Sequence, residues 1–321
     1  MDLQTKIALR KQSEHLIDYN SNLLMIGSCF SENIGERLAY FKFQSTQNPF
    51  GILFHPLAIE TLITNAVEKK IYTNDDVFFH NEQWHSFDAH SKLSHTSKET
   101  LISRLNQNVA ATQESLNKAS HVIITFGTAW VYRFIETQKV VANCHKIPQK
   151  QFLKTLLSVQ EIYETLESIT KSIRSINSNT AVVFTVSPVR HLKDGFIENT
   201  QSKAHLISAI HEFLNQNKIA KDVEAFYFPS YEIMMDELRD YRFYVEDMVH
   251  PNTLAIQYIW EMFKTVWISD EISKTMDTVD GIQKGLQHKA FNENSKAHQK
   301  FLHNLNEKIG ALQTTFPQIK F

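Results

Sequence analysis

The sequence predicts a layered α/β domain built on a mainly parallel sheet, followed by a helical appendage. Short apolar runs alternate with longer segments of helical periodicity, which is the pattern of βαβ units. The runs are continuously apolar rather than alternating, as in strands that are buried on both faces. After residue 267 the strand-like runs stop and polar helix formers dominate, so the sheet is expected to end before that point.

The apolar runs and the helical segments follow one another along the chain. The predicted strands lie at 22–27, 121–127, 181–187 and 224–229. The predicted helices lie at 57–69, 97–117, 150–176 and 200–216. We therefore expect residues 1–267 to form one domain and residues 268–321 to form the appendage. The appendage carries an apolar stripe that would pack on the main domain or on a second copy, giving a homo-oligomer: Phe301, Leu305, Ile309 and Leu312.

The composition is that of an ordinary globular protein, with 42% hydrophobic and 21% charged residues in 321. A formal net charge of −2 gives no electrostatic reason to expect nucleic acid or an anionic membrane as partner. Two cysteines cannot build a disulfide framework or an all-cysteine zinc site, and no stretch has the length of a signal peptide or a membrane span. We expect a cytoplasmic protein that uses no cofactor and no metal.

The stretch "MIGSCFSENIG" at 25–35 places one of only 8 glycines directly before a serine and a cysteine. An apolar run precedes it and helical spacing follows, so Ser28 is predicted to lie on a strand-to-helix turn. A serine there either caps the helix or acts as a nucleophile whose own amide helps to stabilise an oxyanion. A nucleophilic serine needs a histidine base. Cys29 is expected to be a small buried packing residue.

A second stretch, "YVEDMVHPN" at 244–252, supplies such a base. Asp247 and His250 are three apart, and Pro251 is suited to open the helix that follows. An aspartate beside a histidine ring fixes the imidazole tautomer and stabilises the imidazolium. Capping and surface polarity are the alternative explanation for the same pattern.

Together, "GSCF" after the first strand and "DxVHP" before the last main-domain helix resemble the GSCFA family, which is related to the SGNH/GDSL hydrolases. The resemblance spans roughly residues 20–265 and implies a flavodoxin-like three-layer α/β/α fold with serine-dependent ester chemistry. It continues through "NPFGILFHP", "ITFGTAWVYR", "VVANCHKIP", "VSPVRH", "DGFIENTQSKAHL" and "DELRDYRFYVEDMVHP".

By position, the resemblance makes Ser28 the nucleophile, His250 the general base and Asp247 its orienter. Relatives in the superfamily build the oxyanion hole from the serine amide, a glycine amide and an asparagine of a GxND-like segment. Gly51 would be the glycine here. The third segment reads Gly-Thr-Ala-Trp at 127–130 and lacks the asparagine, so the predicted replacement donor is Asn143, with His145 as the next candidate.

Three further residues in the matched segments are predicted to line a substrate cleft, although aromatic side chains also serve as core. They are Trp130, His145 and Tyr244. A Ser–Lys dyad at Ser202–Lys203 is conceivable, but a helix-start serine with a solvated lysine is the favoured interpretation. His85, His90 and His95 have a spacing that favours surface or pocket-rim roles over a metal site.

The leading functional hypothesis is an esterase or acyl-transfer enzyme that removes the acyl group from a carbohydrate or another small O-acyl substrate. The competing hypothesis is a non-catalytic binding or scaffold protein that keeps the fold. The altered segment at 127–130 favours the second hypothesis. The retained serine, aspartate and histidine favour the first.

Overall fold

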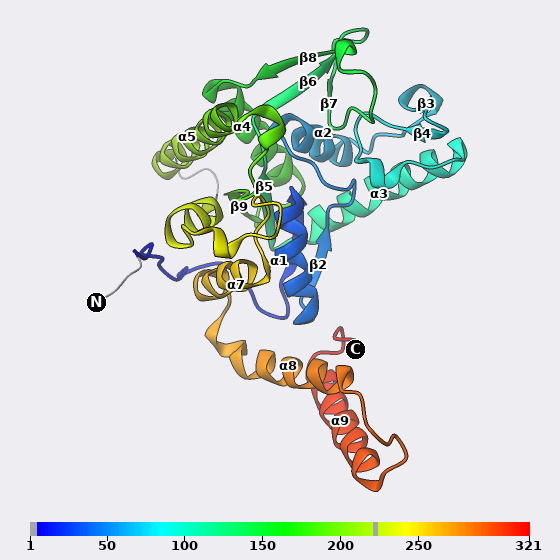
Figure 1. The fold of residues 1–321 in the computed structure, drawn as a ribbon, viewed down its shortest axis with the longest axis vertical. Coiled ribbons are helices and arrows are strands. Elements are labelled where there is room, and N and C mark those ends of the chain that lie inside the picture. The colour runs from blue at the N-terminus through cyan, green and yellow to red at the C-terminus, as the bar shows by residue number, and fades with distance from the viewer. Residues whose placement is uncertain (1–4, 221–223) are drawn as a thin grey trace.

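A computed structural model describes residues 5–220 and 224–321, and at its centre lies a five-stranded sheet (Figure 1). All four pairs of neighbouring strands are parallel, which confirms the prediction of a parallel α/β domain. The chain order of the strands across the sheet is 2-1-3-4-5, as in flavodoxin-like folds. In spatial order the strands are β2 (Gln44–Gln47), β1 (Asn22–Gly27), β5 (His121–Phe126), β9 (Ala181–Val186) and β10 (Ala225–Phe228).

Helices cover both faces of this sheet because successive strand side chains point to opposite sides. Leu24 and Ile26 of β1 face one hydrophobic core, and Leu23 and Met25 face the other. The first core is closed by α2 (Pro56–Val67), α3 (Lys98–Lys118), α4 (Val159–Ile176) and α5 (Phe196–Ala220). The second is closed by α1 (Cys29–Tyr40), the π-helical turn Ile233–Glu237 and α7 (Thr253–Trp267).

Two small antiparallel sheets, which the sequence did not predict, lie at the far end of the body from the chain's last helices (Figure 1). One pairs β3 (Phe78–His80) with β4 (Gln83–His85), and the other orders β7 (Val140–Val141), β6 (Trp130–Phe134) and β8 (Phe152–Leu156). The helix predicted from residue 150 therefore begins only at Val159. Residues 152–156 pair with β6 instead, and Ser158 then caps the helix.

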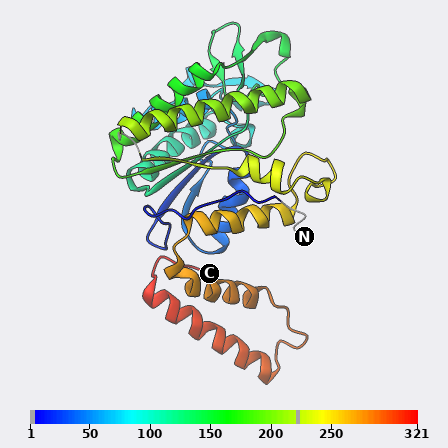
Figure 2. The same ribbon diagram turned by 90° about the vertical axis from the view of Figure 1, so that its left-hand side faces the viewer.

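The last two helices, α8 (Ser273–Gln287) and α9 (Lys296–Thr315), form a pair that projects from the body (Figure 2). Leu305 and Leu312 of the predicted stripe are buried and join the second core, whereas Phe301 stays 38% exposed. The Tyr40 hydroxyl donates to Asp280 at 2.8 Å, which ties α8 to α1. None of the helices in the described ranges is long and apolar enough to cross a membrane.

We predict that Gly27→Ala destabilises the protein by at least about 2 kcal/mol. Gly27 has a φ of +141°, and a Cβ there would lie 2.1 Å from the Thr125 carbonyl oxygen on the neighbouring strand. Urea unfolding of the two proteins gives the difference.

Gly281→Ala is the matched control, because a Cβ at Gly281 in α8 meets nothing within 4 Å. Because Gly281 lies in the middle of a helix, this change should raise the unfolding free energy of the protein by roughly 0.5–1 kcal/mol. Equal stability of the Gly27→Ala protein and the wild type would contradict the close approach of β1 and β5.

Candidate active site

The turn between β1 and α1 holds Ser28 as the N-cap of the helix. Its side chain is 0% exposed, and Oγ accepts a hydrogen bond from the Phe30 amide at 3.4 Å. The Ser28 amide donates to the Thr125 carbonyl at 3.0 Å. Both polar groups of Ser28 are therefore engaged inside the protein in this structure.

Cys29, the first residue of α1, is only partly buried, so the expectation of a small buried packing residue is wrong. Burial and the neighbouring Glu32 carboxylate raise the pKa of the thiol. Lys203 and the amides of Cys29 and Phe30 oppose that rise, because each favours the thiolate. The net result is a raised pKa of the thiol, although the thiol lies at a helix N-terminus.

Asn48, which follows β2, supports the same turn from the side. Its Oδ1 accepts the Gly27 amide at 2.8 Å, and the residue is 8% exposed. Its Nδ2 is buried and has no hydrogen-bond partner within the described ranges. An amide donor without a partner therefore lies next to the turn.

Asp247 and His250 form the pair that the sequence predicts. His250 Nδ1 lies 2.6 Å from one Asp247 carboxylate oxygen, and the other oxygen accepts the amides of Val249 and His250 at 2.8 and 2.9 Å. The bond from the His250 amide first, and then the bonds from the His250 imidazole and the Val249 amide, lower the pKa of Asp247 to about 2. The aspartate engages Nδ1, which leaves Nε2 as the ring nitrogen for proton transfer.

Arg190, in the loop after β9, holds the loop that carries this pair. Its Nη2 donates to the Met248 carbonyl at 2.9 Å, and its guanidinium stacks over the Tyr244 ring at 5.0 Å. Tyr244, predicted to bind substrate, thus lies beside the Asp247–His250 loop. It lines a pocket of about 190 Å³ together with Arg190, Met234, Met235, Arg239, Asp240 and Tyr241.

Lys203 of α5 is 1% exposed, so the expectation of a solvated lysine is wrong. It lies on the same helical stripe as Leu206 and Ile210, which turns it toward the core. Its Nζ donates to the Gly127 and Ser187 carbonyls, each at 2.7 Å, just beyond the ends of β5 and β9. No carboxylate in the described part of the chain pairs with it, and burial lowers its pKa to about 7.

Ser202, the residue before Lys203, binds the 127–130 segment. Ser202 Oγ accepts the Ala129 amide at 2.7 Å and lies 3.0 Å from Thr128 Oγ1. Ser202 therefore holds the 127–130 segment and is 1% exposed, which excludes the predicted helix-start role at the surface.

His191 connects the end of β5 with the Asp247–His250 loop. Its Nε2 would lie 2.9 Å from a Cβ placed on Gly127, and its ring stands edge-on to Phe54 at 5.3 Å. Burial first, and then the neighbouring Lys203 and His250, lower the pKa of His191 to about 3. The ends of β5 and β9 and the His250 loop therefore meet at one edge of the sheet, the edge where open α/β folds bind ligands.

The other residues predicted for the oxyanion hole and the cleft are engaged elsewhere. The Gly51 amide donates to the Asn48 carbonyl at 2.7 Å, and Asn143 Oδ1 accepts the His145 amide at 2.8 Å. His145 is 4% exposed and packs 4.6 Å from the His85 ring near the small sheets. The Trp130 indole donates to the Glu198 carbonyl at 3.1 Å. Roles for these residues in catalysis stay predictions.

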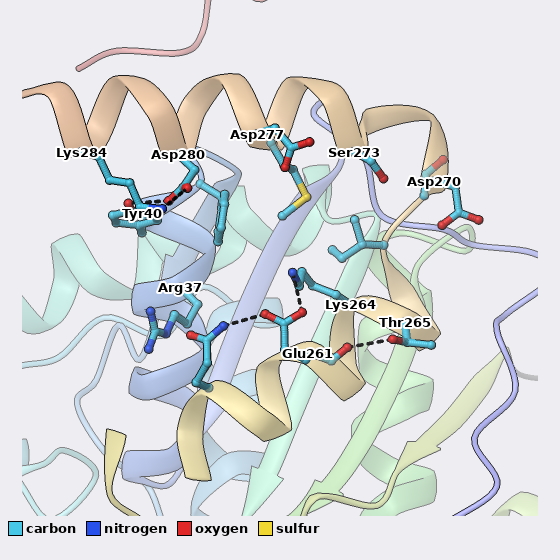
Figure 3. Close-up of a pocket in the computed structure, with 15 residues that line it drawn as sticks. Arg37, Tyr40, Glu261, Lys264, Thr265, Asp270, Ser273, Asp277, Asp280 and Lys284 are labelled. Atoms are coloured by element: carbon cyan, nitrogen blue, oxygen red, sulfur yellow. Dashed lines mark hydrogen bonds and ion pairs between the residues drawn. The ribbon is translucent and has the colours of Figure 1, made fainter. Parts of the chain in front are cut away.

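A larger pocket of about 650 Å³ lies between the body and α8 (Figure 3). Its charged residues mostly neutralise one another: Lys264 pairs with Glu261 at 2.7 Å, and Lys284 pairs with Asp280 at 2.6 Å. The last turns of α1 and α7 line it. The pocket therefore lies at the opposite ends of these helices from Ser28 and His250.

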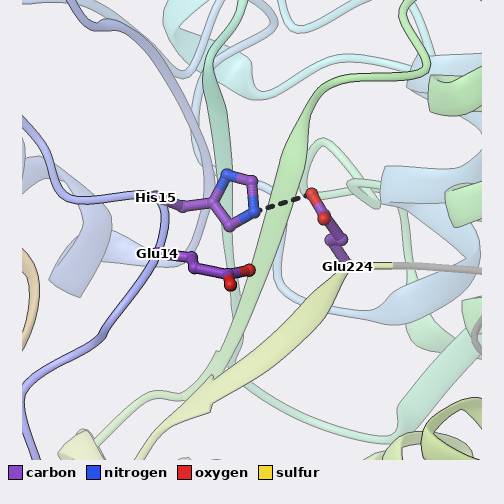
Figure 4. A group of neighbouring side chains, drawn as sticks. All are labelled: Glu14, His15 and Glu224. Carbon is purple, nitrogen blue, oxygen red and sulfur yellow. Dashed lines mark ion pairs between the residues drawn. The ribbon is translucent and has the colours of Figure 1, made fainter.

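The described residues contain one group close enough to share a metal ion, formed by Glu14, His15 and Glu224 (Figure 4). His15 Nε2 lies 2.7 Å from a Glu224 carboxylate oxygen, so the geometry is that of an ion pair. Both glutamates are exposed, and Glu224 directly precedes β10. The group lies at the start of a strand, away from the ligand-binding edge.

Comparison with protein families fits this arrangement. The GSCFA family model matches residues 22–263, which include the turn after β1 and the Asp247–His250 loop. The chain belongs to the GSCFA family. The model of the GSCFA domain protein C-terminal domain matches residues 279–321, which cover most of α8 and all of α9. A search of curated proteins gave no match.

Sequence reasoning misinterpreted Lys203 as solvated and missed Arg190 and His191. The signal for Lys203 was its position on the stripe that includes Leu206, Ile210 and Phe213. Arg190 and His191 follow a predicted strand directly, where the edge of a parallel sheet offers polar residues to a ligand.

We predict that the unfolding free energy of the wild type, relative to that of Lys203→Met, rises by about 2 kcal/mol between about pH 7 and pH 9. The folded-state pKa of Lys203 is about 7, below its usual 10.5, so the unfolded chain binds more protons in this range. Stability is therefore gained as the pH rises above the folded pKa.

Urea unfolding of both proteins across this pH range measures the difference. A difference that stays constant with pH would contradict burial of the lysine without a counter-charge.

Proposed function

We propose that this GSCFA protein is an ester hydrolase or acyl-transfer enzyme that works through a covalent acyl-enzyme. The observation that carries the proposal is the Asp247–His250 pair, with Nδ1 held at 2.6 Å and the loop tied by Arg190 to the end of β9. An oriented imidazole beside a strand-to-helix turn that carries nucleophiles is the arrangement that acyl transfer requires.

In the serine-dependent form that the sequence predicts, Ser28 Oγ attacks the ester carbonyl while His250 takes its proton. His250 then returns the proton to the leaving alcohol, and Asp247 stabilises the imidazolium between the two steps. Water releases the acyl group by the same route in reverse. For this attack the Ser28 hydroxyl must leave its hydrogen bond with the Phe30 amide and become accessible.

The proposed substrate class is a small O-acyl compound, with acylated carbohydrates as the default by superfamily analogy. The pocket of about 190 Å³ beside the His250 loop has methionine and tyrosine walls and suits a short acyl group. Arg190 and Arg239 at its rim favour an oxygen-rich or anionic neighbour to that group.

The second candidate is a binding or scaffold protein that uses the same edge. The observation that favours it is the enclosure of Ser28, whose amide and hydroxyl are both engaged. On this account an acylated sugar would bind without turnover.

We predict that His250→Ala lowers kcat/KM for p-nitrophenyl acetate by about 10²–10⁴ through loss of the general base. Asp247→Asn should lower it by a similar factor, because the imidazole loses its orienting carboxylate. The exposed His303 on α9 provides the matched control, and His303→Ala should leave the rate unchanged.

Release of p-nitrophenolate is the measurement, with circular dichroism to verify folding. A His250→Ala rate within twofold of the wild type would reject His250 as the base. Binding of acylated sugars by a wild type that turns over no ester would favour the binding protein.

A further inference from the structure

The pocket of about 190 Å³ shares part of its wall with the Asp247–His250 loop. Tyr244, which lines the pocket, forms a β-bridge with Pro251, the residue directly after this loop. Arg190, which also lines it, donates to the Met248 carbonyl within the loop at 2.9 Å. A molecule in this pocket therefore lies against the loop that holds the proposed general base.

Two arginines give this pocket a positive charge that the protein does not neutralise. Arg190 and Arg239 line it, and no carboxylate in residues 5–220 and 224–321 forms an ion pair with either. The one acidic residue in the wall, Asp240, pairs with Arg242 at 3.1 Å and accepts the Arg242 amide at 2.8 Å. The carboxylate in the wall is thus engaged with an arginine that does not line the pocket.

The guanidinium of Arg190 is held in place by uncharged groups. Its central carbon lies 5.0 Å from the Tyr244 ring centre and 5.9 Å from the Tyr241 ring centre. Its Nε is buried and has no hydrogen-bond partner within the described ranges, although every guanidinium nitrogen is a donor. Buried donors without a partner are rare in proteins and are costly. A negative charge in the pocket would offset that cost.

The remaining wall selects what can carry the charge. The side chains of Met234, Met235, Tyr241 and Tyr244 offer apolar and aromatic surface, and the small volume suits a single ring or a short chain. An arginine fork matches the two oxygens of a carboxylate. The described residues that line the pocket include no lysine, serine or threonine, which would add donors for a phosphate.

We propose that this pocket is a carboxylate subsite, an inference that rests on the hydrolase or acyl-transfer function proposed above. The substrate class is then an O-acyl compound that carries a carboxylate close to its ester. Arg239, which is exposed, binds the carboxylate directly. Arg190 adds its charge and connects the subsite to the Asp247–His250 loop. Both arginines determine specificity, whereas the proton transfer belongs to His250.

Binding of three small aromatic probes to the full-length chain tests the subsite without turnover. With ¹³C-methyl methionine, the signals of Met234 and Met235 are followed during titration with 4-hydroxybenzoate, phenyl phosphate and the neutral 4-hydroxybenzamide. The benzoate should bind about tenfold more tightly than the amide, because its hydrogen bonds to arginine are charge-assisted. The signal of Met276, which lines the pocket between the body and α8, should stay unchanged.

Arg239→Gln should weaken binding of 4-hydroxybenzoate about tenfold and remove its advantage over the amide. Arg104→Gln is the matched control, because Arg104 is an exposed arginine on α3 that lines no part of this pocket. This change should leave the affinity for both probes as it is.

Equal affinity of the wild type for 4-hydroxybenzoate and the amide would overturn the subsite. So would equal weakening by the two arginine substitutions, or a response of Met276 in place of Met234 and Met235. Tighter binding of phenyl phosphate than of 4-hydroxybenzoate would overturn the carboxylate assignment.

Hydrolysis of 4-acetoxybenzoate and 4-acetoxybenzamide, the acetyl esters of two of these probes, separates the subsite from the hydrolase function. The wild type should show a kcat/KM about tenfold higher for the benzoate, and Arg239→Gln should remove this preference. Carboxylate-selective binding by a protein that hydrolyses neither ester would support the subsite and reject the hydrolase function. Equal kcat/KM for the two esters would overturn the subsite and leave the hydrolase function standing.

Discussion

The ammonium group of Lys203 joins the carboxyl ends of two central strands, and the arrangement of the site depends on this contact. It bonds the carbonyls of Gly127 and Ser187, which open the loops after β5 and β9. The loop after β9 carries Arg190 and His191. Arg190 donates to the Met248 carbonyl in the Asp247–His250 loop, and His191 lies near His250. Burying an ammonium without a carboxylate costs several kcal/mol, so a core built for stability alone would not favour it. The function proposed above would use this charge, because it lies at the sheet edge where open α/β folds bind ligands.

The turn after β1 is the second constraint. Gly27 permits β1 to approach Thr125 more closely than a Cβ would allow. At this close approach the Ser28 amide donates to the Thr125 carbonyl. Cys29, the residue that follows, is then the first residue of the helix. The same geometry that caps α1 with serine therefore presents the cysteine.

The sequence was a good guide where local pattern decides the outcome. Four of the five central strands are continuous apolar runs and were predicted, whereas β2 reads Gln-Ser-Thr-Gln and is an edge strand of half-buried polar residues that carries no such signal. The β6–β8 pairing was missed because residues 152–156 look helical until a distant partner strand is known. Antiparallel pairing of that kind is fixed by tertiary contact rather than by propensity.

The candidate site also combines contacts that local sequence spacing predicts with contacts that it does not. Asp247 and His250 lie on one short loop, so their spacing alone predicted the contact. Lys203 reaches carbonyls 76 and 16 residues away, and no local pattern reveals these partners. Whether Ser28 or Cys29 is accessible depends on the burial of the finished turn. The missing asparagine of the 127–130 segment was visible in the sequence, but the unpartnered amide of Asn48 was not.

Nuclear magnetic resonance of ¹³C-labelled histidines tests most directly whether the β1–α1 turn and the Asp247–His250 loop form one centre. In the Cys144→Ser protein, ring signals are recorded before and after carboxamidomethylation of Cys29. If the turn and the loop form one centre, the signals of His250 and His191 shift, and the signal of the exposed His303 on α9 stays unchanged. Unchanged signals for His250 and His191 after complete modification of Cys29 would contradict it.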